Sequence, residues 1–140
     1  MTHDPESRTL QVHRHTTVHY RVAGDGPRPV VLVHGFGASS HSWDNLMDRL
    51  PPDRVTCYAV DLKGFGKSSK HPDDRYGIDA QAQAVEAVMR HEGLADVVMV
   101  GNSMGGGVVL YEAVRDARRD DKLLAGIVLL GPACYPQALP

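Results

Sequence analysis

The sequence is poor in cysteine, in charge of one sign and in long apolar runs, and each shortage excludes a class of protein. Its 140 residues contain two cysteines, Cys57 and Cys134, without the Cys-x-x-Cys spacing of a thiolate metal site, so no disulfide framework is expected. Fifteen Lys and Arg residues against seventeen Asp and Glu give a net charge of -2, which favours neither nucleic acid nor a membrane surface as partner. No apolar run reaches membrane-spanning length.

The composition that remains is that of a globular chain. Hydrophobic residues make up 42% and charged residues 23%, a balance that excludes a disordered segment or a coiled coil. The length allows one domain with a buried core. Residues 1–9 are polar and interrupted by Pro5, and we expect them to form a disordered N-terminal tail. Few cysteines and no apolar signal segment favour a cytoplasmic location.

Short apolar runs alternate with amphipathic segments along the rest of the chain. Strands are expected at 10–20 (a hairpin), 30–33, 55–60, 97–100 and 124–130, and helices at 43–50, 78–93 and 108–118. This order predicts an α/β fold in which helices flank a mostly parallel sheet. Such sheets bind their ligands at the carboxyl ends of the strands, where the glycine-rich segments of this sequence lie.

One of these segments, Gly101-x-Ser103-x-Gly105, stands between a predicted strand and a predicted helix, which is the context of a nucleophile elbow. At such a turn the serine has a strained backbone, and the residues two positions before and after it must be small. The turn exposes the Ser103 hydroxyl and leaves the Met104 amide at the helix start, where it can donate to an oxyanion. Ser103 is therefore the candidate nucleophile.

A second glycine-rich loop, His34-Gly35-Phe36-Gly37, follows a neighbouring buried strand. The amide of Phe36, or less favourably that of Gly37, can provide a second donor for the oxyanion hole. We expect His34, Gly35, Gly37 and Asn102 to line the site. Either loop alone is also explained as a tight turn that any α/β domain needs, but two loops in the correct order favour a hydrolase.

These segments resemble the α/β-hydrolase superfamily. Residues 34–37 are similar to its oxyanion motif, residues 61–68 to its D-x-x-G-x-G-x-S segment, and residues 101–106 to its elbow. The resemblance covers about residues 10–132 and implies a three-layer sandwich. The Asn-Ser-Met-Gly-Gly sequence is similar to the elbow of carbon–carbon bond hydrolases that cleave aromatic ring-fission products. Esterases and haloperoxidase-like members carry related elbows. A serine at position 103 argues against haloalkane dehalogenases and epoxide hydrolases, whose family nucleophile is an aspartate.

The resemblance also implies residues that this sequence does not contain. In the family the triad acid and histidine follow the nucleophile, but no Asp or Glu follows Asp121 and no His follows His91. We therefore expect residues 10–140 to be the N-terminal part of an α/β-hydrolase domain, truncated before the lid and the last strands. Alone, such a chain should show little or no turnover. Its exposed sheet edge predicts self-association or a completing C-terminal polypeptide.

We expect none of the histidines to replace the missing base or to form a metal site. His34 and His41 lie nearest to the predicted site, but His34 is expected to be structural, and neither is expected to act as a base. His13, His15 and His19 share one strand parity, which we interpret as a solvated face. No metal or cofactor is predicted.

The alternatives to a hydrolase are a nucleotide-binding protein and a non-catalytic binding or scaffold protein. Residues 64–68 superficially resemble a phosphate loop, but Asp61 stands where that loop needs a glycine, and Ser40 stands where the dinucleotide fingerprint needs one. A non-catalytic binding or scaffold protein is the stronger alternative. The sequence therefore predicts a serine hydrolase acting through Ser103 on a small-molecule ester or ketone substrate once its site is completed.

Overall fold

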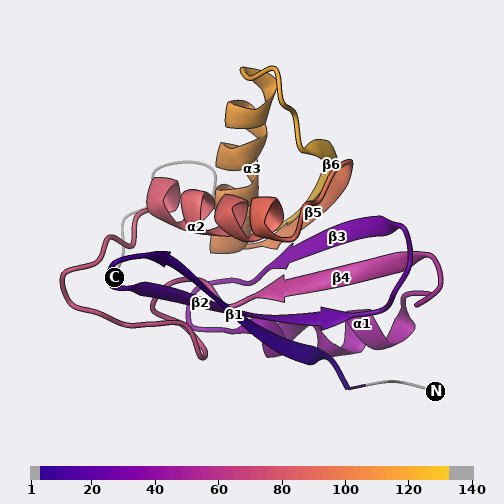
Figure 1. Ribbon diagram of the computed structural model, residues 1–140, viewed down its shortest axis with the longest axis horizontal. Coiled ribbons are helices and arrows are strands. Elements are labelled where there is room, and N and C mark those ends of the chain that lie inside the picture. The colour runs from indigo at the N-terminus through magenta and orange to yellow at the C-terminus, as the bar shows by residue number, and fades with distance from the viewer. Residues whose placement is uncertain (1–3, 133–140) are drawn as a thin grey trace.

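A six-stranded sheet with helices on both faces forms the body of the protein (Figure 1). The computed structural model describes residues 4–132. The strands are β1 (Glu6–His13), β2 (Thr16–Ala23), β3 (Arg28–Val33), β4 (Val55–Val60), β5 (Val97–Asn102) and β6 (Leu124–Leu130). The helices are a short 3-10 turn η1 (Ser40–Trp43) and the α-helices α1 (Asp44–Arg49), α2 (Ile78–His91) and α3 (Met104–Ala117).

The strand order is β1-β2-β4-β3-β5-β6, and the four strands from β4 to β6 in this order run parallel. The other two strands are antiparallel to their neighbours: β1 pairs with β2, and β2 pairs with β4. The predicted α/β fold with a mostly parallel sheet is thus confirmed. Because β3 lies between β4 and β5, the three loops that follow these strands meet at one edge of the sheet. This edge holds all three predicted motifs.

The helices divide the core into two layers. Helix α1 lies on one side of the sheet, and α2 and α3 lie on the other (Figure 1). Alternate residues of the buried strand β3 serve both layers: Leu32 packs with Trp43 and Met47 on the α1 side, while Val31 and Val33 pack on the opposite side. Each such fully buried aliphatic side chain stabilises the fold by roughly 1.5–3 kcal/mol. This explains why β3 is an uninterrupted apolar run.

Strand β1 begins earlier than the sequence suggested. Residues 6–9, expected to belong to a disordered tail, pair with β2, Glu6 opposite Val22 and Thr9 opposite His19. Their polar character suits an edge strand with one face in water. The Arg8 guanidinium fastens this strand to the end of α2 by donating to Glu92 across 2.6 Å. Residues 1–3 of the predicted tail lie outside the described part.

Two helices also differ from the expectation. The predicted helix at 43–50 is divided into η1, capped by the Ser39 hydroxyl, and the short α1. Helix α3 begins at Met104 rather than 108 and includes the glycines 105–107. Glycine lowers helix propensity by about 1 kcal/mol relative to alanine. Close packing against β3 requires the glycine at position 105, as described below.

Strand β6 forms one edge of the described sheet. In residues 4–132 it pairs with β5 alone, and its Val128 and Leu130 side chains remain 44% and 46% exposed. The predicted open edge is therefore present in this part of the chain, and residues 133–140 lie outside it. No helix between residues 4 and 132 has the length and apolar character needed to cross a membrane.

Candidate active site

Ser103 lies at the turn between β5 and α3. Its backbone has φ 54° and ψ -118°, a region that residues with a side chain rarely adopt. The residue is exposed, and its N–H donates to the Leu130 carbonyl at 2.9 Å, which fastens the turn to the end of β6. Ser103 is thus an exposed residue at a strained turn between a strand and a helix.

The small residues of the motif are required by backbone contacts. A Cβ atom on Gly101 would stand 2.4 Å from the Gly105 carbonyl oxygen, and one on Gly105 would stand 2.2 Å from the Val33 carbonyl oxygen. Both distances are far below van der Waals contact, so only glycine lets α3 approach β5 and β3 this closely. The close approach places the first turn of α3 beside the oxyanion loop.

The oxyanion loop touches the elbow. A Cβ atom on Gly35 would lie 3.3 Å from Ser103 Cβ and 3.4 Å from the Asn102 carbonyl oxygen. Phe36 follows with a side chain that is 79% exposed, and Gly37 has φ 75°. The structure therefore brings the predicted residues of both loops to one place, with Asn102 exposed at the end of β5.

Two backbone amides beside Ser103 remain available. Met104 is the first residue of α3, and neither its N–H nor that of Phe36 has an acceptor among the described residues. The first N–H groups of a helix lack intrahelical partners, and the helix dipole gives this end a partial positive charge. The Met104 amide can therefore donate to an anionic oxygen near Ser103, and the Phe36 amide follows Gly35, which lies against Ser103.

His34 is structural, as expected. It is fully buried, its Nδ1 contacts the Gly35 carbonyl oxygen at 2.7 Å, and its Nε2 accepts from the Leu62 N–H at 2.9 Å. These partners require the neutral tautomer with a proton on Nδ1. Burial lowers the pKa of His34, which reinforces the neutral form. With both ring nitrogens bonded, His34 links β3 to the loop after β4 and does not act as a base.

The other described histidines are not bonded to Ser103, although His71 lines the cavity described below. His41 is exposed and pairs with Asp44 at 3.0 Å, and the rings of His15 and His71 stack with centroids 4.1 Å apart. Within residues 4–132 no histidine is hydrogen-bonded to the Ser103 hydroxyl. That part of the chain also has no group of three or more His, Cys, Asp or Glu residues placed to hold a metal ion.

The expected solvated face of His13, His15 and His19 is wrong for His19. This side chain is buried, and its Nδ1 lies 2.8 Å from Asp61 Oδ2. The three histidines do not share one strand, because β1 ends at His13 and β2 begins at Thr16, and β2 is buried along nearly its whole length. Parity along one strand could not show this, because the partner of His19 lies 42 residues away.

The D-x-x-G-x-G-x-S segment is a structural turn around Asp61. Its carboxylate accepts from the N–H groups of Ser40 at 2.6 Å and Lys67 at 3.0 Å, while the Ser68 hydroxyl donates to its carbonyl at 2.6 Å. Gly66, at φ 53°, leaves room for the carboxylate, which a Cβ would approach to 2.4 Å. Although burial acts to raise it, these bonds and His19 lower the pKa of Asp61. The motif thus holds the loop that flanks the elbow.

A cavity of about 370 Å³ opens between Phe36, Met104 and the segment after β4. Its size lies within the usual range of small-molecule pockets. Its walls combine aromatic, aliphatic and basic side chains, namely Phe36, Phe65, Tyr76, Pro72, Met104, Lys63, Lys70 and His71. Sequence reasoning missed most of these residues, because they come from an irregular loop without hydrophobic periodicity. Their closeness to the elbow makes the cavity part of the candidate site.

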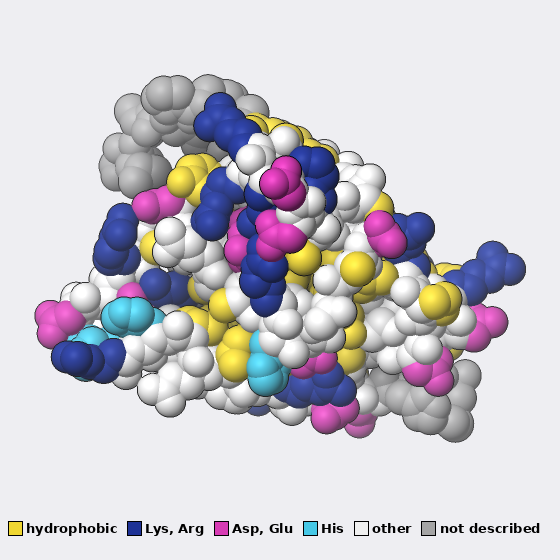
Figure 2. All heavy atoms as spheres, turned by 45° about the horizontal axis from the view of Figure 1, so that its top comes forward, with side chains coloured by type: hydrophobic (Ala, Val, Ile, Leu, Met, Phe, Trp, Pro, Cys, Tyr) yellow, Lys and Arg dark blue, Asp and Glu magenta, His cyan; other side chains and the backbone are white. Residues whose placement is uncertain are grey.

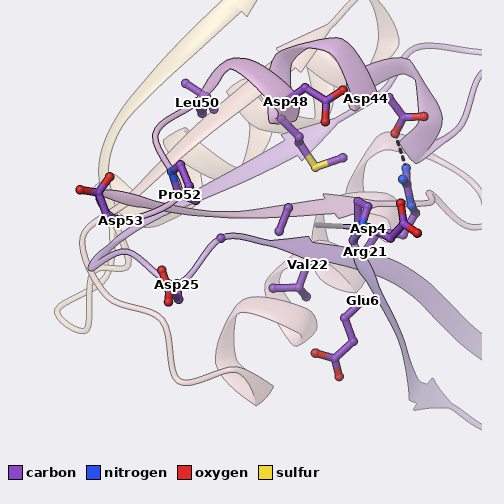
Figure 3. A pocket seen from close by; sticks show the side chains of 14 residues that line it. Asp4, Glu6, Arg21, Val22, Asp25, Asp44, Asp48, Leu50, Pro52 and Asp53 are labelled. Carbon is purple, nitrogen blue, oxygen red and sulfur yellow. Dashed lines mark hydrogen bonds and ion pairs between the residues drawn. The ribbon is translucent and has the colours of Figure 1, made fainter. Parts of the chain in front are cut away.

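A larger hollow of about 780 Å³ lies between β2 and α1, away from the elbow (Figure 3). Its rim carries the carboxylates of Asp4, Glu6, Asp25, Asp44, Asp48 and Asp53. Arg21 is the one basic residue among the described residues that line it. Its guanidinium donates to Asp44 at 2.6 Å, the contact drawn dashed in Figure 3. None of the elbow or oxyanion residues lines this hollow, so it is not part of the candidate active site.

Residues 28–140 match the family described as alpha/beta hydrolase fold. The chain belongs to this family. The membership confirms the resemblance drawn from the three motifs, and it agrees with the elbow geometry at Ser103. The α/β hydrolases that this chain resembles are named for several different activities.

Three of these α/β hydrolases show the range. A non-heme haloperoxidase from Rhodococcus erythropolis is 38% identical over 134 residues, 89% of this chain and 47% of the relative. A 2-hydroxy-6-oxo-6-phenylhexa-2,4-dienoate hydrolase from Comamonas testosteroni is 34% identical over 118 residues, 82% of this chain and 40% of the relative. The solved esterase from Exiguobacterium antarcticum aligns with a TM-score of 0.81 at 26% identity, over 91% of this chain and 46% of that one. The chain therefore spans less than half of the length of each.

Proposed function

We propose that this chain carries the nucleophile and the oxyanion hole of a serine hydrolase that cleaves an ester or a carbon–carbon bond beside a carbonyl. The strained, exposed Ser103 at the start of α3 is the observation that supports this best. A fold that maintains such a conformation spends roughly 1–3 kcal/mol on it, and strain of this kind concentrates at functional sites. The substrate is a small molecule that carries the carbonyl group.

In the proposed reaction the Ser103 hydroxyl oxygen attacks the carbonyl carbon while a base takes its proton. The carbonyl oxygen becomes an oxyanion, which accepts hydrogen bonds from the Met104 and Phe36 amides. Collapse of this intermediate breaks the bond to the leaving group, which takes up a proton and departs. Water then attacks the acyl-serine and releases the acid product.

Among residues 4–132 no histidine is hydrogen-bonded to the Ser103 hydroxyl, and His71, which lines the adjoining cavity, stacks on His15. We propose that a further polypeptide segment, carrying the acid and the histidine that follow the nucleophile in the family, completes the site. Without a base the serine hydroxyl is a weak nucleophile, and only the residual effect of the oxyanion hole and of binding remains. We therefore expect slow acylation and little turnover from the 140-residue chain alone.

A labelling experiment tests the nucleophile. The chain is incubated with a fluorophosphonate and analysed by intact mass and peptide mapping, beside the variants Ser103→Ala and Ser42→Ala. Ser103→Ala retains a Cβ atom, so position 103 keeps the same backbone strain. Ser42 is an exposed serine of η1 that does not line the cavity beside the elbow. We expect one adduct on the wild type and on Ser42→Ala, and none on Ser103→Ala.

Added imidazole separates a competent elbow from an inert turn. An external base that enters the site should raise the labelling rate of the wild type with saturation, because it replaces the missing histidine. It should have no effect on Ser103→Ala. If Ser103 remains unlabelled in the presence of imidazole, the catalytic proposal is wrong, and the chain is better described as a non-catalytic binding or scaffold protein.

A further inference from the structure

The cavity beside the elbow is basic in a chain that is slightly acidic as a whole. Among the residues that the structure describes, Lys63, Lys70 and His71 line it, and no Asp or Glu does. The larger hollow of Figure 3 has the opposite character, with six carboxylates and one arginine. Since the net charge is -2, the positive lining is a local feature of this cavity. Local charge of one sign in a concave site raises the concentration of ligands of the opposite sign.

Lys63 does not provide a free positive charge there. Its ammonium lies 2.9 Å from Asp74 Oδ1, and both side chains are 8% exposed. Asp74 also accepts from the Thr16 hydroxyl. Despite partial burial, these contacts lower the pKa of Asp74 to about 2, so its carboxylate offsets the charge of Lys63. Lys63 and Asp74 therefore connect the cavity wall to strand β2.

Lys70 differs because its two partners are neutral. Its ammonium donates to the Gly66 carbonyl at 2.7 Å and to the Ser68 carbonyl at 3.3 Å. In residues 4–132 no carboxylate lies within ion-pair distance of it. An ammonium has three donors, so one remains for a ligand while the other two fix its position. The charge is thus uncompensated and held at the rim of the cavity.

The apolar walls of the cavity are also held in place. The Phe36 and Phe65 rings meet edge to face with centroids 5.5 Å apart. The Tyr76 hydroxyl donates to the His71 carbonyl at 2.5 Å, which closes the segment after Lys70 on itself. A preformed apolar cavity with one placed charge selects ligands that match both features.

We propose that this cavity binds the acyl part of the substrate as an apolar chain or ring that ends in a carboxylate, and that Lys70 is the specificity residue that recognises this carboxylate. The proposed function places the reacting carbonyl between Ser103 and the Phe36 and Met104 amides, and Phe36 and Met104 both line the same cavity as Lys70. The inference rests on that function for the identity of the ligand as a substrate. The recognition of a carboxylate by Lys70 can be measured without any reaction.

A binding experiment on the full chain tests the inference. 3-Phenylpropionate and its neutral, equally shaped amide are titrated into the ¹⁵N-labelled protein and followed by amide NMR shifts. The variants are Lys70→Met and Lys67→Met, which remove the same charge three residues apart. Lys67 does not line the cavity, and its fold contact is made by its backbone N–H. Thermal unfolding confirms that both variants fold.

We expect the carboxylate to bind about fivefold more tightly than the amide, as for a partly exposed ion pair. Lys70→Met should abolish this preference and leave amide binding unchanged, while Lys67→Met should retain it. Equal binding of the two ligands, no binding of either, or an equal loss in both lysine variants would overturn the inference. The outcome is independent of Ser103 labelling, so a failure here leaves the proposed nucleophile intact, and the reverse also holds.

Discussion

Ser103 keeps a backbone conformation that costs free energy, and its surroundings explain why the turn does not relax. The N–H of Ser103 is bonded to Leu130, its carbonyl accepts from Gly106, and its neighbour Gly105 is packed against the backbone of β3. Relaxing the turn would move the start of α3 away from the sheet. The strain is therefore maintained by contacts at both sides of the serine, and those contacts depend on residues without a side chain.

Gly105→Ala should accordingly be strongly destabilising. Its new methyl group would stand 2.2 Å from the Val33 carbonyl oxygen and 2.4 Å from that of His34. Both atoms belong to a central part of the sheet and cannot move aside. We expect the free energy of unfolding, measured by urea denaturation, to fall by about 3 kcal/mol. The steric cost thus exceeds the gain of about 1 kcal/mol that alanine brings through its higher helix propensity.

Gly126→Ala provides the matched control. Gly126 lies on β6, and a Cβ atom there would have no heavy atom within 4 Å. Its replacement should leave the unfolding free energy within about 0.5 kcal/mol of the wild type or raise it slightly. The steric argument fails if Gly105→Ala is as stable as Gly126→Ala.

At the scale of elements, hydrophobic pattern was a good guide to the parallel strands and a poor guide to the polar edge strand. The apolar runs identified the inner strands β3, β4 and β5, which are mostly buried, and also β6, which is apolar although it lies at an edge. Strand β1 was missed in its first half because an edge strand tolerates polar residues. The start of α3 was missed because packing, not propensity, puts glycines there.

Part of the candidate site was also predictable from the sequence and part was not. Ser103 and the oxyanion loop could be identified because each depends on a local backbone turn. The cavity walls could not, because their positions depend on contacts distant in sequence. The buried Gln81 side chain of α2, for example, holds Lys63 through two hydrogen bonds of 2.9 Å to its backbone. No local pattern indicates which helix fixes an irregular loop.

Helices α2 and α3 are joined by a cluster of carboxylates around Arg119. Its guanidinium contacts Glu86 at 2.5 Å, Glu112 at 2.6 Å and Asp116 at 2.9 Å. Glu112 is fully buried, and its Oε2 has no hydrogen-bond partner among the described residues. Burial and the adjacent Glu86 raise the pKa of Glu112 to about 7. Although burial opposes it, bonding to Glu112 and Arg119 lowers the pKa of Glu86 to about 2.

This pair makes the stability of the helix layer depend on pH. The pKa of Glu112 is higher in the folded chain than the usual value near 4.3 in an unfolded one. Its contribution is therefore complete at low pH and is lost as the pH rises through about 7. Glu112→Gln mimics the protonated acid, so we expect it to unfold with a free energy higher than the wild type by about 2 kcal/mol at pH 8.5, and by much less at pH 5.5.

Glu86→Gln should show the opposite behaviour. Because the pKa of Glu86 is lowered, its contribution is present above about pH 4.5 and is lost as the pH falls toward 2. This variant should be less stable than the wild type at neutral pH by about 1–3 kcal/mol. Urea denaturation across this pH range checks both variants, and parallel curves for wild type and Glu112→Gln would contradict the assigned ionisation.

At the scale of the whole molecule, the two edges of the described sheet have opposite character. The exposed positions of β1 are polar, whereas β6 exposes Val128 and Leu130. Basic and acidic side chains are interleaved over the face shown in Figure 2 rather than gathered in one field. A net charge of -2 adds little repulsion between copies. The apolar edge is thus the surface where association should occur.

We therefore expect the 140-residue chain to associate in a concentration-dependent manner in sedimentation velocity, through contacts at β6. Val128→Lys places a charge at this edge and should weaken the association about tenfold or more, because burial of a valine contributes roughly 1.5–3 kcal/mol and each 1.4 kcal/mol is a factor of ten. Val114→Lys is the control, since Val114 is 46% exposed, close to the 44% of Val128, but lies on α3. A wild type that sediments as a monomer at all concentrations would disprove the expectation, and an equal effect of both lysines would assign the contact to α3 as well. Loss of association in Val128→Lys alone would show that the open strand edge, and not general apolar exposure, governs how this chain meets a partner.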